Sequence, residues 1–349
     1  GDGGALRAGL YRMLQSEYGR IRSRCVDVGT LDGDAWVAQA VHELGADDDA
    51  VEVRYRAGRR ECAQLEEVTL PAAAPSLAWS PEGVLWITGG TRGLGLASAR
   101  HYVARHGVKR LVLTGRETLP DRAQWAARTA QTDATGLKLR ALLALEADGV
   151  MLETTSVDLA DATALRHEMQ RLTQALGPIH GVLHCAGLAD GQTPAFVHKT
   201  PAGIAAVLAP KVAGLDTLLH CLREEAPSLR FCVLFSSISA LAPDLASGQA
   251  DYAMANAYMD TVARRTHDLP VASVQWGSWN ESGMGEVKSR VYRELGLASH
   301  SDAQGMAWLD RIVATEVRGV LAPLQVDASR FDAQRLLQRR RAAPAVRSA

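Results

Sequence analysis

A short strand that runs into a glycine-rich turn constrains the fold of this chain more than any other feature. Residues 84–88 have β-propensity, glycines follow at Gly89, Gly93 and Gly95, and a helical pattern begins directly afterwards. Glycines allow a ligand to approach the backbone closely, and free N–H groups at a helix start attract a pyrophosphate. An ordinary β–α turn is the alternative, but the flanking strand and helix supply the context that a dinucleotide site requires.

The next predicted strand, residues 110–114, indicates which dinucleotide is bound. It ends at Gly115 and Arg116, near the place where an acidic residue would hold the ribose hydroxyls of NAD. An arginine there suits the 2′-phosphate of NADPH. Glu117 gives the competing interpretation, but it lies one residue beyond the arginine. The sequence therefore favours NADPH.

From residue 84 onward, apolar strand-like runs alternate with helical patterns. This alternation predicts an α/β, Rossmann-like, doubly wound parallel sheet covered by helices on both faces. Residues 5–80 show a helix–strand–helix–strand order without a phosphate turn, and the prolines of residues 71–81 mark a domain boundary. Residues 277–302, rich in Gly and Ser, are expected to cover the site as a lid.

Composition and charge narrow the function classes. The chain has 349 residues, 47% of them hydrophobic, and a formal net charge of −1, which argues against nucleic-acid and membrane-surface roles. Its 5 cysteines form no C-x-x-C pair and no metal-ligand spacing with histidine, so no metal site is predicted. Without a signal peptide or a run of eighteen apolar residues, we expect a cytoplasmic protein. The start at Gly1, without methionine, suggests a piece of a longer polypeptide.

A candidate catalytic group follows the predicted strand of residues 231–235. Tyr252 opens the next helix, Ser237 ends the strand, and Asn256 lies one helical turn after Tyr252. A phenol with a pKa of about 10 needs a nearby cation to act as an acid near neutrality, and Lys211 is the obvious cation. Two unit charges about 4 Å apart near a surface interact by roughly 4 kcal/mol, so we expect Lys211 to lower the pKa of Tyr252 against the effect of burial. Singly, these residues would more often be a core tyrosine, a solvated lysine and a strand-end hydroxyl.

The motifs together resemble the ketoreductase domains of polyketide synthases, within the short-chain dehydrogenase/reductase superfamily. The resemblance covers about residues 5–327 and rests on Thr88–Gly95, Leu113–Arg116, His184–Gly187, Pro210–Gly214, Phe235–Ser237 and Tyr252–Asn256. Ordinary members of the superfamily carry Y-x-x-x-K. Here Asn256 takes the place of that lysine and Lys211 lies upstream, an exchange typical of the ketoreductase domains. The sequence of residues 252–260 is similar to the corresponding segment of synthases that recruit a separate, trans-acting acyltransferase.

The resemblance implies an NADPH-dependent reductase of β-ketoacyl chains carried on the phosphopantetheine arm of an acyl carrier protein, working beside other synthase domains. It implies a partial, non-cofactor-binding structural subdomain in residues 1–80 with its earlier half missing, a catalytic subdomain in 81–330 and a linker in 331–349. The alternatives are a silent or epimerising domain, a free-standing reductase or a binding module. The implied catalytic residues are Tyr252, Ser237, Lys211 and Asn256, and the implied cofactor-binding residues are Gly89, Thr91, Arg92, Gly93, Leu94, Gly95, Thr114, Arg116, Asp158, Leu159, Cys185, Ala186 and Gly187.

Three positions depart from the commoner family pattern. The loop between Ser237 and Tyr252 is about two residues longer, so Ser239 competes with Ser237 for the catalytic serine. A stereochemical Leu-Asp-Asp marker reads Leu-Ala-Asp-Gly in residues 188–191, and the tryptophan that marks the other class is Asp244. The configuration of the alcohol is therefore open. Trp276, Gly277 and Met284 are expected to border the substrate channel.

Overall fold

A seven-stranded, fully parallel sheet forms the centre of the protein, seen here in a computed structural model that describes residues 2–29, 33–71, 77–187, 195–283 and 290–338. The strand order is β11-β9-β8-β7-β4-β5-β6, which is that of a Rossmann-like fold. The strands are β4 (Val84–Thr88), β5 (Arg110–Thr114), β6 (Met151–Thr155), β7 (Ile179–His184), β8 (Phe231–Ser237), β9 (Val271–Trp276) and β11 (Gly319–Leu321). The predicted fold class is confirmed.

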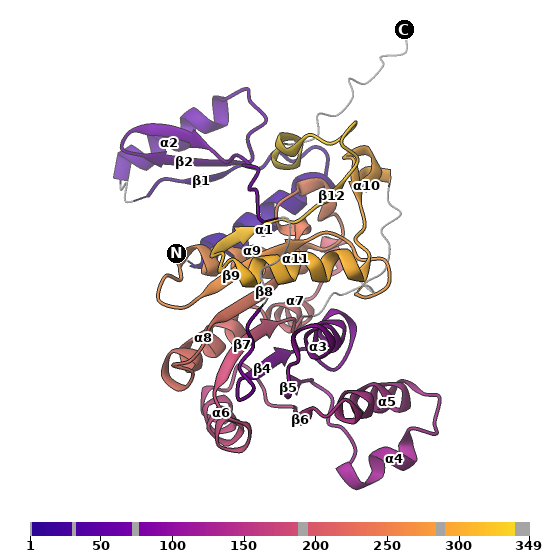
Figure 1. Ribbon diagram of the computed structural model, residues 1–349. Coiled ribbons are helices and arrows are strands. Elements are labelled where there is room, and N and C mark those ends of the chain that lie inside the picture. Colours follow the sequence, from indigo (N-terminus) through magenta and orange to yellow (C-terminus); the bar gives the residue numbers. More distant parts are fainter. Residues whose placement is uncertain (1, 30–32, 72–76, 188–194, 284–289, 339–349) are drawn as a thin grey trace.

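Helices cover both faces of this sheet, which explains why the central strands are apolar on both sides. One face carries α3 (Gly93–His106), α4 (Trp125–Arg128), α5 (Ala134–Ala147) and α11 (Asp302–Ala314), and these share one apolar core with the sheet. The opposite face carries α6 (Ala162–Leu176), α8 (Ala213–Glu225) and α9 (Ala250–Arg265), which share a second core (Figure 1). All residues of β4 are buried between these layers.

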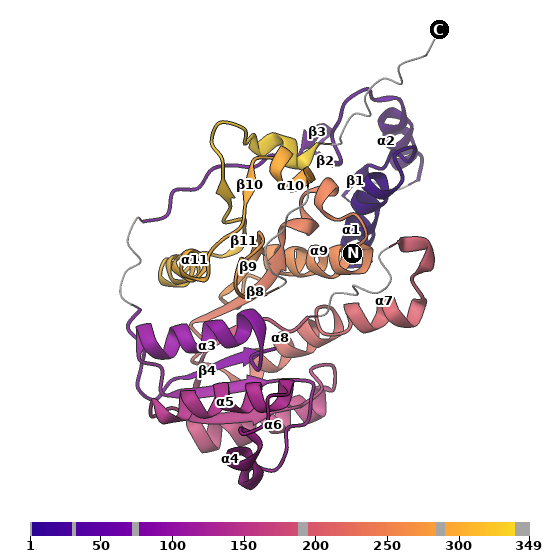
Figure 2. The same ribbon diagram turned by 90° about the vertical axis from the view of Figure 1, so that its right-hand side faces the viewer.

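The first part of the chain contributes one helix that packs on the central domain and one small separate sheet. α1 (Asp2–Glu17) packs on α9, so closely that a Cβ on Gly9 would lie 2.8 Å from the carbonyl of Ala253. β1 (Cys25–Asp27), α2 (Gly33–Gly45), β2 (Glu52–Arg56) and β3 (Arg59–Cys62) follow. β1 and β2 pair in parallel, whereas β2 and β3 form an antiparallel hairpin that the sequence prediction did not include. This small sheet stands apart from the central one (Figures 1 and 2).

The last elements build a cap beside the carboxyl end of β8. They are α10 (Arg290–Glu294), β10 (Leu297–Ala298), β12 (Gln325–Val326) and the 3-10 helix η5 (Ala333–Leu337). Leu336 and Leu337 are buried against Ile238 and Leu241, so the described start of the predicted linker packs on the domain. Residues 339–349 of that linker lie outside the described residues. Shorter 3-10 helices are η1 (Arg122–Gln124), η2 (Phe196–His198), η3 (Ile238–Ala240) and η4 (Pro243–Leu245).

One helical stretch, Pro201–Glu225, is long and apolar enough to cross a membrane by length and composition alone. Core helices of globular proteins pass the same test. The structure divides this stretch into α7 (Pro201–Leu208) and α8. Lys211 lies in the break and its side chain is buried, and α8 packs in the core beside α6. These contacts are those of an internal helix of a folded domain.

Candidate active site

The glycine-rich turn between β4 and α3 has the geometry of a phosphate site. Gly89 has a φ of +70°, and a Cβ there would lie 2.8 Å from the backbone nitrogen of Ala186, so only glycine fits. Gly95 packs against the backbone of Gly89 and Gly90 in the same way. Gly93 differs, because its φ is +52° and a Cβ would meet no atom within 4 Å. Its missing side chain faces open space at the start of α3, where a pyrophosphate is best accepted.

The residues predicted to read the adenosine end follow β5. A Cβ on Gly115 would lie 2.7 Å from the Oγ1 atom of Thr91, so these two residues hold the turn against the strand end. Thr114 is buried and accepts a hydrogen bond of 2.7 Å from the Trp86 indole, which is a structural role. Arg116 is exposed, and the competing Glu117 is paired with Lys138 on α5. Glu117 is therefore already neutralised, whereas the guanidinium of Arg116 is available to a ligand.

The remaining predicted cofactor residues lie at the carboxyl ends of β6 and β7, the same edge of the sheet as the glycine turn. Asp158 is exposed and holds the backbone N–H of Ala160 at 2.9 Å, and Leu159 is buried in the core under it. Arg92 is exposed and Leu94 half-buried at the start of α3. Cys185 and Ala186 follow β7 next to Gly89, and their backbone forms one wall of the turn. The structure thus brings these segments together at one edge of the central sheet.

Lys211 is the centre of the candidate catalytic group. Its ammonium donates hydrogen bonds to the carbonyl of Phe235 at 2.9 Å and to the Oδ1 atom of Asn256 at 2.6 Å. Its Nζ atom stands 5.1 Å from the centre of the Tyr252 ring. Burial lowers the pKa of Lys211 to about 8, with the charge of Asp260 acting in the opposite direction. Lysine is still mostly charged at neutral pH, so the site holds a buried cation.

Gly187 is required by this lysine. A Cβ at Gly187 would lie 2.5 Å from the Cε atom of Lys211, so any larger residue would displace the side chain. Residues 210–212 also leave the helical path at this point, which lets Lys211 turn inward between β7 and β8. The His-Cys-Ala-Gly segment therefore supports the lysine as well as the cofactor turn.

The predicted lowering of the Tyr252 pKa is wrong for the free protein. Burial raises the pKa of Tyr252, and hydrogen bonds with Asn256 and Ser237 only partly oppose it. The reason is geometric, since the Lys211 ammonium lies over the face of the ring and is itself held by Phe235 and Asn256. The phenol thus stays protonated at neutral pH.

The two serines after β8 differ in their geometry. Ser237 is the last residue of β8 and makes a hydrogen bond with Tyr252 that lowers the pKa of the phenol. Ser239 is buried, and both its hydroxyl and its backbone N–H donate to the Oγ atom of Ser237, at 3.0 Å and 3.2 Å. Because these two bonds use the lone pairs of Ser237, its own hydrogen is directed outward to Tyr252 and the space beside it.

Sequence reasoning missed three buried polar groups behind this site. Asp260 accepts hydrogen bonds from Ser273 and from Gln275, each 2.7 Å long, and burial raises its pKa. His184 shares a 2.8 Å hydrogen bond with Thr88, and burial together with the Lys211 charge lowers its pKa to about 3. A single polar residue in an apolar strand or helix carries no spacing signal that would reveal such partners.

The third missed group is an ion pair at the start of α9. Lys199 and Asp251 lie 3.0 Å apart, and each side chain is only 1% exposed. The other oxygen of Asp251 accepts the backbone N–H of Tyr252 at 2.9 Å. Asp251 therefore fixes the first turn of the helix that carries Tyr252.

Trp276 and Gly277, which were predicted to border the substrate channel, lie at the end of β9. Trp276 is buried in the core against Phe235 and Trp279, with ring centroids 5.6 Å and 5.1 Å away. Gly277 lies beside the Tyr292 hydroxyl, which a Cβ would approach to 3.0 Å. Asp244, the position of the stereochemical tryptophan, lies in η4. Met284 and residues 188–191, which carry the other stereochemical marker, lie outside the described residues.

Comparison with known proteins agrees with this geometry. The model of the KR domain family matches residues 83–281, more than half of the chain. The chain belongs to the KR domain family. Polyketide synthase PksL of Bacillus subtilis (strain 168) is 43% identical over 339 residues, which are 96% of this chain but 7% of PksL. The 6-methylsalicylic acid synthase of Penicillium terrestre is 35% identical over 61% of this chain and 12% of its own length. The chain thus spans only a small part of these curated relatives.

Solved ketoreductase structures share the fold of this chain. A ketoreductase domain from the bacillaene assembly line superposes with a TM-score of 0.77 at 25% identity, over 95% of this chain and 76% of that one. The first ketoreductase of the tylosin synthase gives a TM-score of 0.74 at 26% identity, over 95% and 67%. Membership of the KR domain family and the match to solved ketoreductases support an oxidoreductase that uses a nicotinamide cofactor. The curated relatives are multidomain synthases.

Proposed function

We propose that this KR domain is an NADPH-dependent reductase that converts a β-ketoacyl chain on an acyl carrier protein to the β-hydroxyacyl chain. The observation that carries the proposal is the buried Lys211, which connects Phe235 of β8 to Asn256 of α9 directly below the Tyr252 ring. A buried cation beside a phenol and a serine at the end of a strand is an arrangement for placing a proton on a developing alkoxide.

The residues of the chain divide the chemistry between them. Tyr252 and Ser237 are hydrogen-bonded to each other, so their two hydroxyls lie close enough together to hold the ketone oxygen of the substrate between them. Tyr252 then supplies the proton, and the charge of Lys211 stabilises the phenolate that remains. Asn256 holds the lysine in place at 2.6 Å. When bound, the nicotinamide cofactor supplies the hydride for the ketone carbon.

The glycine turn fits the cofactor that this chemistry needs. The open space at Gly93 and the closely packed backbone of Gly89 and Gly95 would admit a pyrophosphate at the start of α3. Thr91, Arg92 and Leu94 lie in the same turn. The exposed Arg116 at the end of β5 supports the choice of NADPH over NADH, because a guanidinium pairs well with a 2′-phosphate.

The length of the relatives supports the proposed partners and the form in which the substrate arrives. A chain that covers 7% of PksL and 5% of PksN corresponds to one domain among many, so the ketone would arrive on a carrier protein from neighbouring synthase domains in the cytoplasm. The wording of residues 252–260 supports a synthase with a trans-acting acyltransferase. The division into a structural subdomain, 1–80, a catalytic subdomain, 81–330, and a linker belongs to the same proposal.

The alternatives fit the site less well. A silent or epimerising domain would not need Lys211 over the Tyr252 ring together with a hydrogen bond between Ser237 and Tyr252. A free-standing reductase is disfavoured because the curated relatives are much longer chains.

Replacement of Tyr252 by Phe tests the proposal. Tyr252→Phe removes the proton donor but keeps the ring over Lys211, so turnover of a carrier-bound β-ketoacyl chain should fall by about a hundredfold or more. NADPH binding, measured by fluorescence, should stay close to that of the wild type. Chiral analysis of the wild-type product would also give the alcohol configuration. Near-normal turnover in Tyr252→Phe would refute the assignment.

A further inference from the structure

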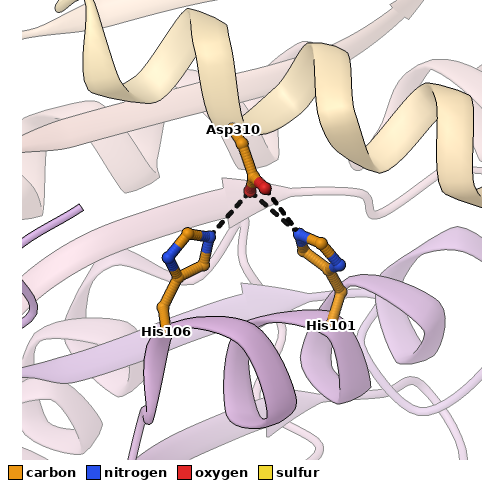
Figure 3. Close-up of side chains that lie close together, drawn as sticks. All are labelled: His101, His106 and Asp310. Carbon is orange, nitrogen blue, oxygen red and sulfur yellow. Dashed lines mark hydrogen bonds and ion pairs between the residues drawn. The ribbon is translucent and has the colours of Figure 1, made fainter. Parts of the chain in front are cut away.

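Three side chains far apart in the sequence converge between α3 and α11, away from the catalytic group. His101 and His106 come from the last two turns of α3, and Asp310 comes from the facing side of α11 (Figure 3). The Nε2 atom of His101 lies 2.9 Å from both carboxylate oxygens of Asp310. The Nε2 atom of His106 lies 2.8 Å from one of them. One nitrogen from each imidazole is therefore aimed at the same carboxylate.

The surroundings of this group are those of a half-enclosed site. The side chains of His106 and Asp310 are each 8% exposed, whereas that of His101 is 23% exposed and leaves a path from solvent. The Asp310 carboxylate lies between the two imidazoles, within 2.9 Å of a nitrogen of each. It thus occupies the position of a shared ligand.

We propose that His101, His106 and Asp310 bind a divalent transition-metal ion, with Zn²⁺ as the preferred ion. Imidazole and carboxylate are the ligands that zinc accepts, and three protein ligands with one open position form a familiar zinc geometry. The three ligand atoms lie within 4.8 Å of one another. With bonds of about 2.0–2.1 Å, tetrahedral ligands stand roughly 3.3 Å apart. Each nitrogen would need to move back from the carboxylate by only about half an ångström.

The metal would join two elements that flank the cofactor turn. α3 begins at the glycine-rich turn and ends at His106, while the N-terminus of α11 holds the loop that follows β9. In that loop, the backbone N–H of Ser282 donates to Asp302 at 3.1 Å, and a Cβ on Gly283 would lie 3.4 Å from Leu94. A metal between α3 and α11 would thus fix this loop relative to the start of the cofactor site.

The three proposed ligands are too far apart in the sequence to form a recognisable metal-binding motif. The prediction that the chain has no metal site rested on short-range patterns of cysteine and histidine, whereas 204 residues separate His106 from Asp310. His101 and His106 are also five residues apart on one helix, which is not a spacing that places two side chains on one face. Only the packing of α11 on α3 brings the three ligands together.

Metal titration of the 349-residue chain tests the proposal. After treatment with EDTA and its removal, calorimetry should show one equivalent of Zn²⁺ bound, Zn²⁺ should raise the Tm, and Co²⁺ should give the visible absorption of a tetrahedral site. Mg²⁺ should neither bind at this site nor raise the Tm, because it prefers oxygen ligands. His101→Gln and His106→Gln should each weaken Zn²⁺ binding by about a hundredfold or more, since losing even a supporting partner of a ligand costs 10- to 100-fold.

Two further variants separate the outcomes. Asp310→Asn removes the charged ligand. The His101 side chain is more exposed, so His101→Gln should keep the fold, and its circular dichroism spectrum should match that of the wild type. His167→Gln on the exposed face of α6 is the matched control and should bind Zn²⁺ like the wild type. Failure of the wild type to bind Zn²⁺, or equal binding by all variants, would overturn the proposal. A Tm that depends on pH but not on Zn²⁺ would assign the group as a proton-dependent histidine–aspartate pair instead and would equally overturn it.

Discussion

At the end of β8, two serine hydroxyls compete for one role, and their hydrogen bonds rank them. Ser237 accepts from both the hydroxyl and the backbone of Ser239, so its own hydrogen is left to donate toward Tyr252 and a substrate oxygen. Ser239 is buried one residue inside η3 and acts on Ser237. The longer loop before Tyr252 therefore does not displace Ser237 from the strand end.

Separate alanine variants test this ranking. Ser237→Ala should lower kcat/KM by about a hundredfold, the scale of losing one donor to a developing oxyanion. Ser239→Ala should cost less than about tenfold, because it removes only the support of Ser237. Steady-state kinetics on a β-ketoacyl thioester would measure both. If Ser239→Ala alone abolished turnover, Ser239 would be the catalytic serine.

Arg116 is the residue on which the cofactor choice depends. It is exposed at the end of β5, where a 2′-phosphate would lie. Arg116→Ala should weaken NADPH binding by about 1.5 to 3 kcal/mol, the value of a hydrogen bond to a charged group, and leave NADH binding nearly unchanged. Glu117→Gln is a matched control, since Glu117 already pairs with Lys138. Equal losses of NADPH and NADH affinity in Arg116→Ala would contradict the 2′-phosphate role.

At the scale of elements, Glu43 connects α2 to both strands of the β2–β3 hairpin. Its carboxylate accepts hydrogen bonds from Arg60 and Tyr55, each 2.6 Å long, and from Arg24 at 2.6 Å. The Arg60 hydrogen bond is the largest cause of a pKa lowered to about 2, with burial acting against it. The side chain is only 3% exposed, so solvent screens these bonds little.

The sign of the pH effect follows from that lowered pKa. A carboxyl with a folded pKa below its unfolded value of about 4.3 stabilises the fold above that value, and this stability is lost as the pH falls toward about 2. Glu43→Gln should therefore lower the free energy of unfolding by about 2 to 3 kcal/mol at pH 7 and by much less near pH 2. Urea denaturation at several pH values measures this free energy of unfolding.

Glu61→Gln is the control, because Glu61 forms an exposed pair with Arg54. It should change the free energy of unfolding by less than about 1 kcal/mol. A Glu43→Gln effect that is the same at all pH values would contradict the linkage.

The central elements could be predicted because their physical cause is local. Strands buried on both faces are apolar runs, and Gly95 packs against Gly89 and Gly90 within the same turn. The break between α7 and α8 could not be predicted, because it depends on the distant partners of Lys211, Phe235 and Asn256. β3 was missed because its residues are mostly charged and are held by pairs across the hairpin.

At the scale of the whole molecule, the strand order gathers the predicted site residues at one edge. Parallel strands end on the same side of the sheet, so residues that follow β4, β5, β7 and β8 could be expected to meet there. The raised pKa of Tyr252 and the histidine–aspartate group could not be expected, since both depend on how helices pack against one another. Sequence order predicts which edge carries the site, whereas side-chain environment needs the packed structure.

The same architecture predicts unequal stability across the molecule. β4 and β8 lie inside a seven-stranded sheet between two helical layers, whereas β1 is an edge strand of three residues in a three-stranded sheet. Amides with few buried neighbours open more often, and unpaired strand edges lack half of their hydrogen bonds. Hydrogen exchange should therefore be faster in Cys25–Asp27 and Glu52–Arg56 than in Val84–Thr88 and Phe231–Ser237. α1 is the internal control, because Met13 is fully buried on the reductase side and its helix should be protected better than β1. Equal protection of β1, β2, β4 and β8 would show that the small sheet unfolds only together with the reductase, and its independence would be disproved.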